Sequence, residues 1–240
     1  MGVLYVVATP VGNLEDITIR AVRVLLNTGV IVCEDTRHTG QLIKILRERF
    51  KMYESLDLHQ GIRKKFISVR DWNEVEVIPR VLEELGGGDT ALVSDAGTPL
   101  LSDPGFKVVR AAREAGFRVV PIPGPFAGAA ALSVAGLPTN KFMFWGFLPK
   151  KWQLEAEVTH VIYESPVRAT KTIEEINIRY PNARIVVAKE LTKLHESIEP
   201  WREGMAFKGE VTLLVFIPKS VDTQGGQEIA AGHGDGNGDA

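Results

Sequence analysis

Short apolar runs alternate with segments of helical periodicity through most of this chain. Strand-like runs occur at residues 4–8, 30–33, 90–93 and 117–122, and helical periodicity occurs at 17–26, 39–49 and 106–115. A helix between two strands acts as a crossover, which brings successive strands into one sheet in parallel. The alternation therefore predicts an α/β fold with a largely parallel sheet in the first half of the chain.

The second half has a different pattern. A proline-rich stretch at 121–125 interrupts both periodicities, and it is followed by helical segments at 126–135 and 167–179 among strand-like runs at 142–147, 158–163, 184–188 and 211–217. This strand-rich pattern favours a mixed sheet. We predict an N-terminal α/β domain at 1–121, a C-terminal α/β domain at 122–219, and a disordered, glycine-rich acidic tail at 220–240, which has too few large apolar residues to fold.

Composition narrows the class of protein. The chain is 45% hydrophobic and 24% charged, with a formal net charge of −2, which argues against a protein that coats nucleic acid nonspecifically. No apolar stretch is long enough to span a bilayer, and no basic leader precedes residues 4–8, so we expect a soluble, cytoplasmic protein with no membrane association. The single cysteine, Cys33, lies within an apolar run and is expected to be buried. Basic clusters at 47–51, 63–65 and 150–151 leave room for contacts with phosphates.

Polar loops follow one predicted strand after another. They lie at residues 9–16, 34–37, 94–105, 164–166 and 189–190. Ligands of open α/β sheets bind beyond the carboxyl ends of the strands, so together these loops predict a binding site. Individual members also have structural interpretations: Asp35 or Thr36 as a helix cap, Ser165 with Pro166 as a cap pair, and residues 102–104 as the cap of the helix from Gly105.

Several site classes are absent from the sequence. It has no GxGxxG, no GxxxxGK[ST] and no GxSxG, and its five histidines are scattered without metal-ligand spacing, so we predict no metal site. The loops instead offer carboxylates and backbone groups with little phosphate-binding character. S-adenosylmethionine suits such a site because it carries a sulfonium cation and no phosphate.

Eight motifs occur in an order that resembles the ribosomal RNA small subunit methyltransferase I family of the tetrapyrrole methylase superfamily. They are TPVGNL at 9–14, EDTR at 34–37, SDAGTPLLSDPG at 94–105, PGP at 123–125, GFLP at 146–149, ESP at 164–166, KELTK at 189–193 and GE at 209–210. The resemblance implies two α/β domains with a cofactor cleft between them, a homodimer, and S-adenosylmethionine-dependent 2′-O-methylation of a cytidine ribose in the decoding region of 16S rRNA, within the small ribosomal subunit.

The resemblance also implies which residues contact the cofactor. These are Pro10, Ser94, Asp95, Ala96, Gly97, Thr98, Asp103, Pro123 and Gly124. Asp95 is the first choice for a direct contact. We expect RNA contacts from Asn13, Asn73, Glu74, Glu164 and Arg168.

A ribose hydroxyl is a weak nucleophile, so a proton acceptor should lie within reach of it. Among the carboxylates of these loops we expect Glu34 or Glu190 to take this role. Arg37, Arg168 and Lys189 are expected to hold phosphate or ribose oxygens.

The chain departs from the family pattern at three places. Relatives carry a Tyr-His-x-His-Asn-Glu run where this chain has residues 69–74, they have histidine where Val167 stands, and they have a longer basic stretch after residue 149. The missing histidines argue against an imidazole base and leave open a noncatalytic RNA-binding or ribosome-assembly module. A tetrapyrrole C-methyltransferase is the other alternative, although its glycine-rich first loop is replaced here by residues 8–14.

Overall fold

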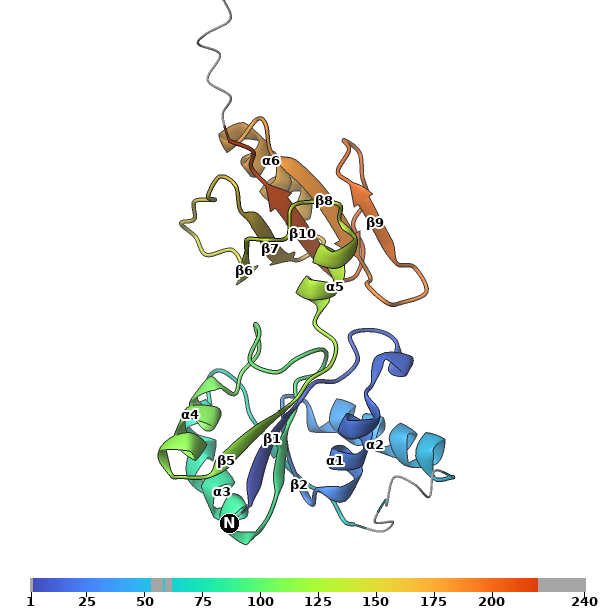
Figure 1. Cartoon of the computed structure of the whole chain (residues 1–240), viewed down its shortest axis with the longest axis vertical. Coiled ribbons are helices and arrows are strands. Elements are labelled where there is room, and N and C mark those ends of the chain that lie inside the picture. Colours follow the sequence, from blue (N-terminus) through green and yellow to red (C-terminus); the bar gives the residue numbers. More distant parts are fainter. Residues whose placement is uncertain (1, 53–57, 59–61, 220–240) are drawn as a thin grey trace, which may run out of the picture.

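The computed structural model describes residues 2–52, 58 and 62–219, and the tail expected at 220–240 lies outside the described residues. Two five-stranded sheets, each with its own helices, lie at opposite ends of the molecule (Figure 1). None of the helices in the described part of the chain is long and apolar enough to cross a membrane.

The first sheet is parallel throughout, with the order β3-β2-β4-β1-β5. Its strands are β1 (Val3–Val7), β2 (Val30–Cys33), β3 (Lys65–Ser68), β4 (Thr90–Leu92) and β5 (Arg118–Ile122). Helices α1 (Ile19–Asn27) and α2 (Thr36–Phe50) pack on one face, and α3 (Glu74–Gly87) and α4 (Phe106–Glu114) pack on the other. Because both faces are covered, β1, β2 and β4 are almost entirely apolar and show little alternation; Thr90 is the exception.

The second sheet is mixed, with the order β6-β7-β10-β8-β9. Its strands are β6 (Phe142–Phe147), β7 (Thr159–Glu164), β8 (Arg184–Lys189), β9 (Ser197–Pro200) and β10 (Val211–Phe216). Strands β6 and β7 are parallel, whereas β10 runs antiparallel to both of its neighbours. Helix α6 (Ala169–Arg179) packs on one face and α5 (Ala127–Val134) on the other. The predicted combination of a parallel and a mixed sheet is confirmed.

The carboxyl ends of the parallel strands face the second sheet. Strand β5 ends at Ile122, and the chain continues through residues 123–126 into α5, which already packs on the second sheet (Figure 1). The loops after β1, β2 and β4 therefore also lie at the edge that faces the second half of the chain. The division of the chain into domains at residue 121 stays a prediction.

The sequence patterns missed two short strands, one α-helix and the 3-10 helix at Leu14–Asp16. Strands β3 and β9 have four residues each and lie at sheet edges, and α3 contains Pro79. Neither strand is a continuous apolar run, because β3 reads KFIS and β9 reads SIEP, and a proline within a helix obscures helical periodicity. Cys33 is fully buried, as predicted, and burial raises the pKa of its thiol to about 11.

Candidate functional site

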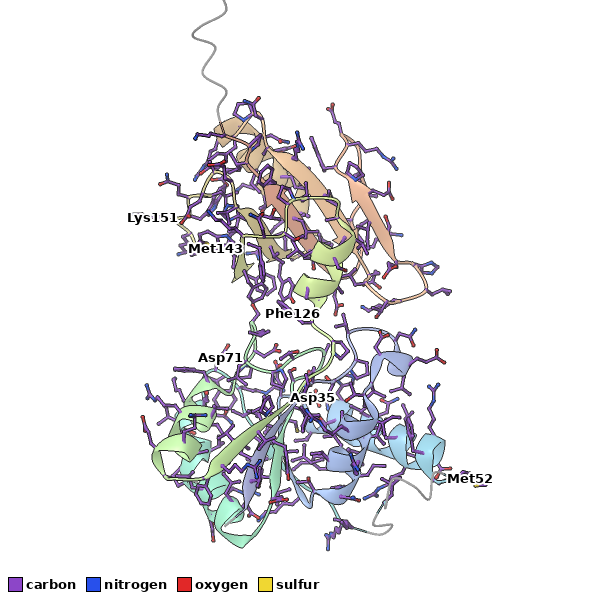
Figure 2. The ribbon with its side chains drawn as sticks, viewed as in Figure 1. Asp35, Met52, Asp71, Phe126, Met143 and Lys151 are labelled. Atoms are coloured by element: carbon purple, nitrogen blue, oxygen red, sulfur yellow. The ribbon has the colours of Figure 1, made fainter. Side chains whose placement is uncertain are left out.

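A pocket lies between the two sheets and takes residues from both halves of the chain. The first half contributes Val11 from the loop after β1 and Ala96, Gly97, Thr98, Leu101 and Asp103 from the loop after β4. The second half contributes Phe126, Ala127, Phe147, Tyr163, Glu164, Ala188, Leu191, Glu210, Val211 and Thr212. Figure 2 places Phe126 at the end of the second half that faces the first, opposite Asp35 and Asp71. Four of the predicted cofactor contacts are thus in the lining, namely Ala96, Gly97, Thr98 and Asp103.

The loop at 94–105 is held against the end of β1. The Thr9 amide donates to the carbonyl of Gly97 at 2.8 Å, and the Gly97 amide donates to the carbonyl of Thr9 at 3.1 Å. Leu100 and Ser102 have φ values of 73° and 74°, a left-handed conformation that costs free energy for residues other than glycine. The loop is therefore an irregular but anchored wall of the pocket.

The segment that joins the two halves is tied to the same loop. The Thr98 hydroxyl donates to the carbonyl of Pro125 at 2.8 Å. Gly124 lies against Ala8, because a Cβ at position 124 would stand 2.9 Å from the Cβ of Ala8. These contacts bring the predicted residues Pro123 and Gly124 beside the pocket, although neither is part of its lining.

Asp103 is the carboxylate of the first half that lines the pocket. Burial raises its pKa to about 6, a hydrogen bond with the Ser94 side chain opposes the shift, and the nearby charges of Glu34 and Asp95 add to it. Residues 102–104 do not cap α4, so that structural interpretation is wrong. The N-cap residue is Gly105, and the buried side chain of Glu74 takes the place of a side-chain cap, because its Oε1 accepts the amides of Gly105 at 3.2 Å and of Lys107.

Asp95 connects the loop after β4 to the start of α2. Its Oδ1 accepts the Asp35 amide at 3.2 Å and lies 3.6 Å from Nδ1 of His38. Asp35 caps α2, as one interpretation of the sequence predicted: its Oδ1 accepts the Arg37 amide at 2.8 Å. Arg37, which pairs with Asp35 at 3.1 Å, is 91% exposed, so its guanidinium can reach a ligand.

The two expected proton acceptors have different environments. Burial raises the pKa of Glu34, and the charge of Asp95 raises it further. Hydrogen bonds lower the pKa of Glu190, first of all the bond from the Glu210 amide at 2.8 Å, then the bond from Nζ of Lys193 at 3.0 Å. Glu190 therefore anchors its own loop as a carboxylate. Neither residue is part of the pocket lining.

Glu164 forms a compact network on the wall made by β7. Its buried carboxylate accepts hydrogen bonds from the Ser165 amide at 2.7 Å and from the Thr172 hydroxyl at 2.7 Å. Arg168 donates to Oε1 through Nε at 2.9 Å and forms an ion pair through Nη2 at 2.8 Å. The structure assigns Arg168 as the N-cap of α6, without a side-chain bond, so the predicted cap pair of Ser165 and Pro166 is corrected.

The remaining predicted residues make hydrogen bonds within the fold. Asn13 Oδ1 accepts the Glu15 amide at 3.0 Å, and Asn73 Oδ1 accepts the Arg70 amide at 2.7 Å. Nζ of Lys189 lies 3.4 Å from the carbonyl of Ala206. The carboxylate of Glu74 is buried against the start of α4, where it accepts backbone amides, so it is not positioned to contact an RNA.

Sequence reasoning did not select several lining residues, among them Phe126, Phe147, Tyr163 and Thr212. The site residues were predicted from the loops that follow the carboxyl ends of strands, and these four residues lie outside those loops. Because β10 is antiparallel to β7 and β8, its first residues, Val211 and Thr212, lie at the edge where those strands end. The GFLP and GE motifs beside these positions were the available signal.

Comparison with known proteins identifies relatives over most of the chain. The family model for tetrapyrrole (corrin/porphyrin) methylases matches residues 3–206. Ribosomal RNA small subunit methyltransferase I of Escherichia coli O157:H7 is 43% identical over 235 residues, which cover 89% of this chain and 77% of that protein. The protein of the same name from Hydrogenobaculum sp. (strain Y04AAS1) is 40% identical over 229 residues, covering 88% and 94%.

Solved structures share the fold at lower identity. A uroporphyrin-III C-methyltransferase from Thermus thermophilus has a TM-score of 0.62 at 20% identity, covering 90% of this chain and 94% of its own. A structure of that enzyme complexed with S-adenosyl homocysteine has a TM-score of 0.59 at 18% identity, covering 89% and 97%. A diphthine synthase has a TM-score of 0.64 at 14% identity, covering 91% and 90%. The predicted tetrapyrrole methylase-like fold is confirmed.

Proposed function

Because the chain belongs to the ribosomal RNA small subunit methyltransferase I family, within the tetrapyrrole methylases, we propose that it methylates 16S rRNA with S-adenosylmethionine. The proposed acceptor is the 2′-hydroxyl of a cytidine ribose in the decoding region. The name shared by these relatives favours this function over that of a tetrapyrrole C-methyltransferase. We further propose that the protein is a cytoplasmic homodimer that acts on the small ribosomal subunit.

The observation that carries the proposal is the chemistry of the pocket lining. It contains the carboxylates of Asp103, Glu164 and Glu210 and no lysine or arginine among the described lining residues. Apolar side chains such as Leu101 and Leu191 make up much of the rest. A cationic cofactor with an adenine ring and no phosphate fits such walls, whereas a nucleotide phosphate bound within them would lie beside these carboxylates.

Methyl transfer to a hydroxyl is an in-line displacement. Bound S-adenosylmethionine supplies an electrophilic methyl group: the carbon–oxygen bond forms as the carbon–sulfur bond breaks, and the hydroxyl proton must leave. We assign that proton to the carboxylate of Asp103, because it lines the pocket and its pKa of about 6 suits a base near neutral pH. The nearby charge of Glu34 helps to raise that pKa. In this proposal Glu34 therefore affects the basicity of Asp103 but does not itself accept the proton.

Basic side chains around the pocket would hold the RNA backbone. Glu164 fixes the guanidinium of Arg168 beside the lining. Arg37, in the first turn of α2, and Lys189, the last residue of β8, lie outside the lining. Phosphate contacts place an RNA without reading its sequence. In this proposal the three cations orient the ribose, and the lining residues select the reacting hydroxyl.

The test is single-turnover transfer of a labelled methyl group from S-adenosylmethionine to 30S subunits from a strain that lacks this gene. Label in the ribose of a 16S rRNA cytidine supports the proposal. Label in a porphyrinoid offered in parallel would favour the tetrapyrrole alternative, and binding without transfer would favour a noncatalytic assembly module. Naked 16S rRNA as a second substrate separates recognition of the rRNA from recognition of the subunit.

Asp95→Ala should weaken S-adenosylmethionine binding about tenfold and leave RNA binding unchanged. The substitution removes a negative charge near the cofactor and the acceptor of the Asp35 amide, so it also loosens the loop wall. Isothermal titration calorimetry with each ligand measures both effects. Asp71→Ala, which removes another carboxylate near Glu34 and Asp103, is the matched control. A larger loss of RNA affinity than of cofactor affinity would contradict the assignment.

A further inference from the structure

One large aromatic side chain of the pocket, that of Phe147, is about half exposed to solvent. Phe147 is the last residue of β6, lines the pocket, and is 55% exposed. Leaving this much apolar surface in water is unfavourable unless a ligand covers it. Phe147 therefore offers a flat apolar surface that the fold itself does not use.

The orientation of the Phe147 ring is restrained by contacts with other aromatic rings. Its centroid is 6.4 Å from that of Tyr163, with 73° between the ring planes. Tyr163 packs edge-on against Phe144 at 5.1 Å, and Phe144 packs in the same way against Phe126 at 5.2 Å. A row of edge-to-face contacts thus connects the exposed ring to Phe144, which packs against a core cluster of the second half, and this limits the freedom of the ring.

A guanidinium stands beside the same ring. Cζ of Arg168 is 5.9 Å from the centroid of Phe147, and the two bonds to Glu164 hold the guanidinium in place. The side chain of Arg168 is 59% exposed. Phenyl rings and guanidinium planes are the two groups on which proteins stack unpaired nucleobases.

The stacking surface lies next to the proposed proton acceptor. At Gly146, which precedes Phe147, φ is +60° and a Cβ would stand 2.1 Å from Oγ of Ser102. The end of β6 is thus packed directly on the loop that carries Asp103. A base held on Phe147 would therefore lie beside the loop that carries Asp103.

We propose that Phe147, flanked by Arg168, is the platform on which the base of the methylated nucleotide stacks. This inference rests on the proposed function, which supplies an RNA substrate. The adenine of the cofactor is the competing occupant. The charge of Arg168 favours the RNA, because a fixed guanidinium attracts the phosphates beside the base and repels a sulfonium cation.

The test compares Phe147→Ala with Phe106→Ala. Phe106 is a matched control because it is 60% exposed, Cζ of Arg110 lies 5.7 Å from its centroid, and it is outside the pocket lining. We expect Phe147→Ala to raise both the KM for 30S subunits and the Kd of subunit binding without cofactor by about tenfold. Phe147→Trp should restore both values. Phe106→Ala should change neither, and the Kd for S-adenosylmethionine should be unchanged in every variant.

Two results would overturn the inference. If Phe147→Ala weakened cofactor binding and left subunit binding intact, the ring would belong to the cofactor site. If subunit binding did not depend on Phe147, no base would stack there, even if methyl transfer to 16S rRNA were intact and the proposed function stood. Because the binding assay needs no turnover, a Phe147-dependent Kd would support the platform even if the wild-type protein transferred no methyl group.

Discussion

Replacing Asp103 by asparagine is expected to lower kcat on the order of 100-fold at saturating S-adenosylmethionine and RNA. The amide has the size of the carboxylate but cannot accept the hydroxyl proton, and general bases contribute roughly 100- to 10,000-fold in rate. Single-turnover methylation of 30S subunits measures the chemical step, and calorimetry separates it from any loss of cofactor affinity. A variant that kept more than a third of the wild-type rate would exclude Asp103 as acceptor.

The pH profile distinguishes the acceptor from its neighbour. The rate of the wild-type protein should rise with pH through about 6, because the pKa of Asp103 is raised to about 6 and only the carboxylate accepts a proton. Glu34→Gln removes a negative charge that raises this pKa, so the rise should move to lower pH with little loss of rate at about pH 8. A large loss at that pH would instead make Glu34 the acceptor.

Asp103→Asn should also make the folded protein more stable at neutral pH. The raised pKa means that the folded state binds more protons than the unfolded state between about pH 4 and 6. The free energy of unfolding therefore falls as the pH rises through this window, and the full penalty is present above about pH 6. Because Asp103 is only half-buried, we discount the penalty for solvent screening to on the order of 1 kcal/mol. Thermal melts at about pH 8 and pH 4 should show a gain only at the higher pH.

The sequence predicts the first half of this site well, for a physical reason. In a parallel sheet all carboxyl ends meet at one edge, so Glu34, Asp95 and Asp103, which follow β2 and β4, must come close together. Apolar runs of four or more residues are sufficient to locate those strands. Neither the choice among the carboxylates nor their pKa values could be predicted, because both depend on burial and on neighbours distant in the sequence.

The second half of the site was less predictable. The direction of β10 depends on its pairing with β7 and β8, and that pairing leaves no trace in the residues of β10 itself. The role of Glu190 was equally hard to predict, because it depends on a contact with a residue distant in the sequence. Its position at a strand end suggested catalysis, but its carboxylate is bound by the amide of Glu210, twenty residues later in the chain.

Replacing Glu164 by alanine is expected to lower the free energy of unfolding by about 2–3 kcal/mol. The buried carboxylate accepts four donor groups, and its removal leaves the Ser165 amide and the Thr172 hydroxyl without this acceptor, at about 1–3 kcal/mol for each polar group that stays buried. The cost stays below that of a broken buried ion pair, because the Arg168 side chain is 59% exposed and regains water. Urea denaturation monitored by circular dichroism measures the change.

Glu164→Gln separates the shape of this side chain from its charge. The amide oxygen can still accept from Arg168, and the Thr172 hydroxyl can rotate to accept from the amide nitrogen, so the expected cost is about 1 kcal/mol or less. Arg168→Ala should cost more than Glu164→Gln, because it leaves the buried carboxylate of Glu164 without its positive partner. Arg168→Ala should also weaken RNA binding, since it removes the guanidinium beside the ring of Phe147. Equal losses of stability in Glu164→Ala and Glu164→Gln would mean that the charge, and not the set of hydrogen bonds, stabilises this wall of the pocket.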